Sequence, residues 1–232
     1  MEKMGKSDLK IRLATCDDFD TLTDISRVCF PEQLRWKAPK SHSRKWWDNL
    51  INSQYCEIWV CSVHGQVIAF VALVFDRIKY EDAWENHHLS FLETLYIFVT
   101  CPKQSLKRTL IKLKLKRVKK LNNHFELFEE SRRTNSYEKI KKIFTEKKPW
   151  CGPSAVLPDM RGEGVSKKIH EHCFERAISL GYKEVYSVVK RKNMMSRVMV
   201  AILGFEVFEK IDHVLFYKKT LENNCDPQIN SA

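Results

Sequence analysis

The sequence predicts an α/β fold, and three observations predict it. Residues 9–14 alternate apolar and charged side chains, which is the pattern of a strand with one buried face. Two apolar runs, residues 57–62 and 66–75, are separated by a His-Gly pair typical of a two-residue hairpin. A third apolar segment, residues 155–157, leads through a glycine turn into a helical pattern.

The remaining elements alternate between helix and strand in chain order. Thr15 or Asp17 can cap a first helix, and Trp46 and Trp47 lie in a second helix around residues 44–52. The helix after the glycine turn ends at Gly181, a typical helix stop. The segments that follow are a strand at 184–189, a helix at 193–203 and a hairpin of 205–210 with 213–218.

A long segment separates the third strand from the fourth. Residues 77–149 are too many for a structureless loop in a compact domain, so we expect two or three helices there, lying over the substrate side. Helical spacing is visible at 89–96 and 136–144, whereas 111–115 also fits a strand. We expect one domain at 8–221 that includes this insertion, and a flexible tail at 222–232.

One segment carries the whole charge imbalance of the chain. From Lys103 to Lys148 there are 16 Lys/Arg and 5 Asp/Glu, whereas the rest of the sequence has 24 of each sign. Two interpretations remain open: a landing site for nucleic acid or another anionic surface, or the solvated outer face of helices.

The composition indicates a globular protein, with 44% hydrophobic and 11% aromatic residues among 232. No apolar run reaches the length of a membrane span, and the first residues lack a secretory signal pattern, so we expect a cytoplasmic protein. The eight cysteines show no ligand spacing, and we expect no metal site.

The glycine turn has the chemistry of an anion site. Arg161-Gly162-Glu163-Gly164-Val165-Ser166 opens a helix. The two glycines let the backbone approach a ligand closely, and the free N–H groups at a helix start favour a phosphate or pyrophosphate. The turn lacks the P-loop Gly-Lys-Ser/Thr and the dinucleotide G-x-G-x-x-G.

This stretch resembles the pyrophosphate loop of the GCN5-related N-acetyltransferases, the GNAT superfamily. The matching features are Arg-x-x-Gly-x-small, with Ser166 as the small residue, and the preceding Val156-x-Pro158. Further along, Asn193 and Gly204-Phe205 resemble the family's Asn and Gly-Phe segment in order and distance. Another similarity, to arylalkylamine-type members, is weaker and concerns the stretch around Glu32.

The resemblance implies a mixed, mostly antiparallel sheet of about seven strands flanked by helices, with the Lys-rich helical insertion between strands 3 and 4. It also implies binding of acetyl-CoA as co-substrate, with its pantetheine paired to the fourth strand and held by Asn193. A backbone N–H at Val156 or Leu157 is expected to stabilise the thioester oxygen. The implied cofactor-binding residues are Ser154, Ala155, Val156, Leu157, Arg161, Gly162, Glu163, Gly164, Val165, Ser166 and Asn193.

The implied catalytic groups are less complete. Glu32 stands where the arylalkylamine-type enzymes carry a glutamate base; it fits equally an exposed loop carboxylate. Val200 occupies the position at which many members have an acidic tyrosine, so the proton for the leaving thiolate needs another source. Trp36, Trp46 and Trp47 can wall an aromatic amine pocket or belong to the core.

Three functions therefore remain. The first is N-acetylation of a small-molecule amine by direct attack on acetyl-CoA, and the second is acetylation of a protein or peptide amine. The third, suggested by Val200, is a catalytically weak CoA-binding module whose basic insertion binds an anionic partner. The acceptor and the oligomeric state do not follow from the sequence.

Overall fold

The computed structural model describes residues 9–31, 33, 39–86 and 136–221. Its core is one open, seven-stranded sheet with the order β1-β2-β3-β4-β5-β7-β6. All neighbouring strands pair antiparallel except β4 and β5, which are parallel. The strands are β1 (Leu9–Leu13), β2 (Cys56–Val63), β3 (Gln66–Val74), β4 (Trp150–Val156), β5 (Glu184–Lys190), β6 (Glu206–Ile211) and β7 (Val214–Thr220).

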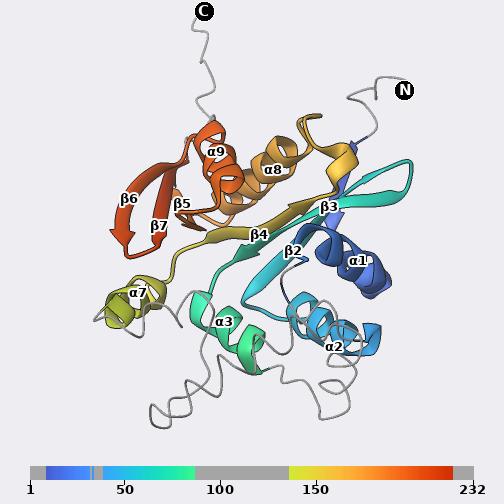
Figure 1. Cartoon of the computed structure of the whole chain (residues 1–232), viewed down its shortest axis with the longest axis horizontal. Coiled ribbons are helices and arrows are strands. Elements are labelled where there is room, and N and C mark those ends of the chain that lie inside the picture. The colour runs from blue at the N-terminus through green and yellow to red at the C-terminus, as the bar shows by residue number, and fades with distance from the viewer. Residues whose placement is uncertain (1–8, 32, 34–38, 87–135, 222–232) are drawn as a thin grey trace, which may run out of the picture.

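Helices cover both faces of the sheet, as Figure 1 shows. Side chains of α1, α2, α3 and α7 pack in one apolar core, and those of α8 and α9 pack in the other, on the opposite face. The described helices are α1 (Phe19–Cys29), α2 (Lys40–Ile51), α3 (Arg77–Asn86), α7 (Ser136–Thr145), α8 (Val165–Ser179) and α9 (Met194–Ile202), with 3₁₀ turns η2 (Cys16–Asp18) and η4 (Pro158–Met160).

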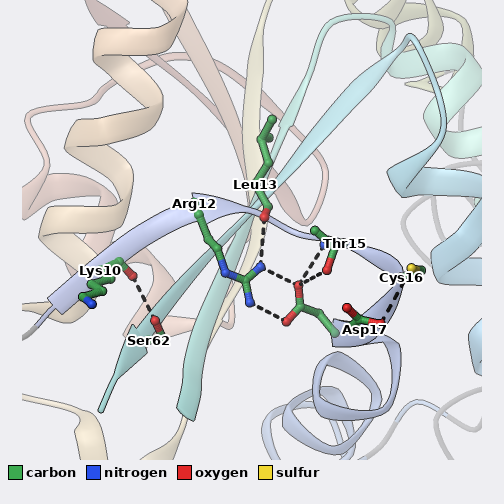
Figure 2. A network of polar contacts seen from close by, with 8 residues as sticks. Lys10, Arg12, Leu13, Thr15, Cys16, Asp17 and Ser62 are labelled. Carbon is green, nitrogen blue, oxygen red and sulfur yellow. Dashed lines mark hydrogen bonds and ion pairs between the residues drawn. The ribbon is translucent and has the colours of Figure 1, made fainter. Parts of the chain in front are cut away.

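A polar network joins the end of β1 to the start of α1. The Arg12 guanidinium donates to both carboxylate oxygens of Asp18, at 2.7 and 2.8 Å, and to the Leu13 carbonyl. In Figure 2, dashed lines lead from both Arg12 and Thr15 to the same carboxylate, that of Asp18. Burial alone would raise the pKa of Asp18, but the bonds from Arg12 and from the Thr15 N–H outweigh it and lower that pKa. The network fixes where α1 starts.

The hairpin of β2 and β3 supplies the centre of the sheet. Its turn has positive φ at His64 (49°) and Gly65 (81°), as a two-residue hairpin with right-handed strand twist requires. Every β3 residue from Val67 to Val74 is buried, because helices cover both faces of this strand.

Strand β4 contains a bulge. Val71 pairs with Ser154 and Leu73 pairs with Cys151, so Gly152 and Pro153 together face the single residue between Val71 and Leu73. The extra residue reverses the alternation of backbone hydrogen bonds along the strand.

Two helices of the insertion lie in the described part of the chain. Helix α7 was expected from its spacing, and its apolar residues Ile140 and Phe144 are buried. Helix α3 was not expected as a separate element. It carries a buried ion pair between Arg77 and Glu81, and the Arg77 guanidinium also donates to the Gly152 carbonyl at the bulge.

The structure confirms the predicted fold class and its strand order along the chain. The predicted strands and helices outside the insertion are present, with ends shifted by a few residues. The expectations for residues 89–121, most of the basic segment 103–148 and the tail 222–232 concern residues outside the described ranges. None of the described helices is long and apolar enough to cross a membrane.

Candidate functional site

The candidate site lies where β4 and β5 separate. These parallel strands pair at only one position, Trp150 with Tyr186. The Tyr186 N–H donates to the Pro149 carbonyl at 2.9 Å, and the Ser187 hydroxyl donates to the Cys151 carbonyl at 3.1 Å. Beyond this point the edge of β4 that faces β5 has no partner strand among the described residues, whereas its other edge stays paired with β3.

The bulge decides which backbone groups face the unpaired edge. The Leu157 N–H donates to the Ile68 carbonyl at 3.0 Å, so the backbone N–H and C=O of Leu157 point toward β3. The backbone N–H and C=O groups of successive strand residues point to opposite edges of the strand. Those of Ser154 and Val156 therefore point to the unpaired edge, and those of Ala155 point toward β3. Of the two expected oxyanion donors, Leu157 is therefore occupied in the sheet, and Val156 faces the site.

The glycine turn directly follows this edge. Gly162 has φ 90° and Gly164 has φ 76°, conformations that side chains rarely adopt. A Cβ at either position would meet no atom within 4 Å, so the space above the turn is open. Gly164 is the N-cap of α8, and the first helical N–H groups, at Val165, Ser166 and Lys167, have no acceptor within the helix. This geometry suits an anion.

The side chains of the turn differ in burial and in their contacts. Val165 is buried in the core under α8, so only its backbone is available to a ligand at the turn, whereas the Glu163 side chain is exposed. Ser166 is half-buried, and its carbonyl accepts a 2.6 Å hydrogen bond from Nδ1 of His170. Burial lowers the pKa of His170 to about 4, so the imidazole is neutral at pH 7 and supports the first turn of α8 without adding charge.

Arg161 joins the turn to the end of α1. Its Nε donates to the Val156 carbonyl at 3.1 Å, and its Nη2 lies 3.7 Å from Cys29 Sγ. The Cys29 thiol also donates to the Val156 carbonyl, at 3.3 Å. Burial raises the pKa of Cys29, and the Arg161 charge opposes that shift. The end of the unpaired edge is therefore held from two elements.

Asn193 and Val200, two positions that the sequence singles out in this region, lie at the start of α9 and within it. The Asn193 side chain caps the helix, because its Oδ1 accepts from the Ser196 N–H at 3.1 Å. This cap leaves the Asn193 amide NH₂ as a donor. Val200 is only 2% exposed and packs in the core beneath α8 and α9.

Other predicted residues fall in the core or outside the described ranges. Trp46 and Trp47 are buried core residues with ring centroids 4.4 Å apart, so the core interpretation is correct for both. Glu32 and Trp36 lie outside the described residues.

Sequence reasoning missed two features of this site. The bulge at Gly152-Pro153 had a visible signal, because glycine and proline inside an apolar run indicate a strand irregularity. The contacts of Cys29 had none, since its partners Val156 and Arg161 are more than a hundred residues away in sequence.

The sequence matches no family model and no curated protein. The fold, in contrast, matches solved structures over most of its length. An N-acetyltransferase from Staphylococcus aureus Mu50 has 13% identity and a TM-score of 0.52, covering 93% of this chain and all 100% of that one. The yncA protein of Salmonella typhimurium, solved with its cofactor acetyl-CoA, has 12% identity and a TM-score of 0.52, covering 96% and 99%.

A third similar structure is the ribosomal-protein-S18-alanine N-acetyltransferase from Escherichia coli, with 10% identity and a TM-score of 0.51, covering 94% of this chain and 97% of that one. Identities this low carry no argument about residues or substrates, but the agreement spans nearly the whole of each chain. The chain has the fold of the GCN5-related N-acetyltransferases.

Proposed function

We propose that the chain is an acetyl-CoA-dependent N-acetyltransferase that acetylates a primary amine. The observation that carries the proposal is the unpaired edge of β4, which runs directly into a glycine turn at the amino end of α8. The Staphylococcus aureus protein with this fold is an N-acetyltransferase, and yncA was solved with acetyl-CoA.

The described residues fit a CoA thioester in two places. Ser154 presents its backbone N–H and C=O to the unpaired edge and Val156 presents its N–H, so the amides of a pantetheine arm can pair there as an added strand does. The N–H groups at the start of α8 and the open space over Gly162 and Gly164 suit a diphosphate.

The same residues suggest a division of chemical work. Acetyl-CoA supplies the acetyl group as a thioester; the amine nitrogen bonds to its carbonyl carbon, the C–S bond breaks, and the amine loses a proton. We assign to the Val156 N–H a hydrogen bond to the thioester carbonyl oxygen, which gains negative charge as the amine attacks. Arg161 positions this peptide edge through the Val156 carbonyl. We assign the base to Glu32, which lies outside the described residues.

For the acceptor we propose a small-molecule amine, with a protein or peptide amine as the alternative. A protein substrate is named for one enzyme of this fold, the ribosomal-protein-S18-alanine N-acetyltransferase from Escherichia coli. The two acceptors differ in size and are separated by a substrate panel.

One observation favours a second candidate, a CoA-binding module without turnover. Val200 is buried in the core, so α9 places no hydroxyl there to protonate a leaving thiolate. Catalysis then depends on the thiolate leaving unprotonated, or on water or another side chain.

Calorimetry with acetyl-CoA, followed by thiol release against a panel of amines, tests the proposal. We expect 1:1 binding together with thiol release that requires an amine. Binding without release for any small amine or peptide would favour the CoA-binding module. Failure to bind acetyl-CoA would refute both.

A further inference from the structure

A basic hollow lies at the carboxyl end of β5, outside the site described above. It has a volume of about 280 Å³ and is lined by Lys190, Arg191, Lys192, Asp212 and His213. Three cations therefore surround it against one carboxylate. Lys190 is the last residue of β5, and Asp212 and His213 form the turn between β6 and β7.

The backbone around the hollow is fixed by hydrogen bonds. The Arg191 N–H donates to the His213 carbonyl at 2.7 Å, and the Asn193 N–H donates to the Lys190 carbonyl at 2.8 Å. The Arg191 guanidinium reaches the Asp212 carbonyl at 3.3 Å. The three consecutive cations are thus held on a tight turn between two elements, which differs from a charge run along a solvated helix.

The position of the hollow favours a ligand. In open sheets, ligands bind beyond the carboxyl ends of the strands, where neighbouring connections diverge. Lys190 ends β5, which has separated from β4 beyond Tyr186, and α9 begins two residues after Lys192, so its positive dipole end adds to the cations. The glycine turn follows the carboxyl end of β4, and the hollow follows that of β5.

We propose that this hollow binds an anionic group, a phosphate or a carboxylate, carried by a ligand of the acetyl transfer. The assignment to that reaction rests on the proposed function. Two sources share this chemistry: the 3′-phosphate of CoA and an acidic group on the acceptor amine. In the second case the acceptor is an amino acid or another amine bearing an acid.

Lys192→Gln tests the hollow, and Lys183→Gln is its matched control. Both lysines lie outside the strand itself, and they flank opposite ends of β5. Because an exposed charge pair is screened by solvent, we expect Lys192→Gln to weaken anion binding only ~3-fold and Arg191→Gln/Lys192→Gln ~10-fold. Lys183→Gln is expected to leave it unchanged.

Inorganic phosphate is the probe that needs no catalysis. In a phosphate titration followed by amide NMR, we expect the signals of residues 190–194 to shift. In Arg191→Gln/Lys192→Gln the midpoint of those shifts should move to ~10-fold higher phosphate while the spectrum stays that of a folded protein. If the glycine turn alone responds, at residues 162–167, and Lys192→Gln behaves as Lys183→Gln in every measurement, the hollow is not an anion site.

Two further arms separate the sources. If Lys192→Gln weakens acetyl-CoA but not 3′-dephospho-acetyl-CoA, the cofactor's phosphate occupies the hollow. If it raises KM for an α-amino acid but not for the corresponding amide, the acceptor's carboxylate does, and both results support the proposal. A chain that fails to bind acetyl-CoA while phosphate still shifts residues 190–194 would refute the acetyltransferase assignment and keep the anion site.

Discussion

Substitutions at Gly164 test the glycine turn most directly, because two side chains of equal size can be compared there that differ only in charge. The residue has φ 76° and caps α8, and a Cβ at this position would meet no atom within 4 Å. Asn and Asp tolerate left-handed backbone better than other side chains, and the strain of replacing glycine is the same for both. Gly164→Asp and Gly164→Asn therefore should fold alike and differ in one negative charge.

The expected size follows from Coulomb's law. A carboxylate about 4 Å from a unit charge repels it by about 1 kcal/mol in bulk water, and by more near a protein surface. A diphosphate carries two charges, so Gly164→Asp should lose at least about 2 kcal/mol of acetyl-CoA binding relative to Gly164→Asn. That is a factor of about 30 in Kd.

Calorimetry of the wild type and both variants measures this gap, with thermal unfolding as the control for folding. Raising the salt to about 1 M shortens the screening length to about 3 Å, so the gap between the two variants should narrow. Equal affinities for Gly164→Asp and Gly164→Asn at low salt would refute a phosphate site at this turn.

The other predictions concern pH, positioning and the catalytic groups. His170 has a pKa of about 4 when folded and 6.5 otherwise, so stability is complete above pH 6.5 and falls toward pH 4. Urea unfolding should show a loss of about 2 kcal/mol from about pH 7.5 to about pH 5, and the loss should shrink in His170→Gln. Arg161→Gln should weaken acetyl-CoA binding or slow turnover several-fold, by about 1 kcal/mol, with little change in Tm because Arg161 is exposed; unaltered kinetics would contradict its positioning role. Val200→Tyr should lower stability by about 1–3 kcal/mol through overpacking, and a faster, fully stable variant would show that an acid was missing. Glu32→Gln should reduce the rate most at low pH. An unchanged pH profile would show that Glu32 is not the base and is an exposed loop carboxylate.

Local patterns were enough to predict most of the fold. The alternation at β1, the His64-Gly65 turn and the stripe of α8 each lie within one element, so their signals are readable in sequence. Helix α3 was not predicted, because its apolar residues do not form a stripe along one side of the helix. Its buried residues include a polar pair, Arg77 and Glu81, which sequence periodicity treats as surface.

The site was predictable in part, and the division is physical. Gly162 and Gly164 are recognisable because their positive φ values restrict the residue type, whereas Val156 and Asn193 were singled out only by their resemblance to a family motif and remain predictions as ligand contacts. Tryptophans at helical spacing give the same pattern in a pocket and in a core, and Trp46 and Trp47 belong to the core. The basic hollow joins residues 190–192 to a turn some twenty residues later, so only the pairing of β5 with β7 brings them together.

The bulge in β4 links these observations, because it sets which backbone groups face the unpaired edge. Near Trp150 the odd-numbered residues, 149 and 151, point toward β5. In a regular strand the same alternation would point the backbone N–H and C=O groups of residues 155 and 157 to that edge and those of Val156 toward β3. The additional residue at Gly152-Pro153 reverses the alternation, so that the Val156 N–H faces the site and the Leu157 N–H bonds to β3. The Arg77 contact at the Gly152 carbonyl and the Arg161 contact at the Val156 carbonyl lie on either side of the reversed segment. The expected oxyanion donor is thus placed by a one-residue register change, and helix α3 of the insertion contributes the buried arginine that contacts the bulge.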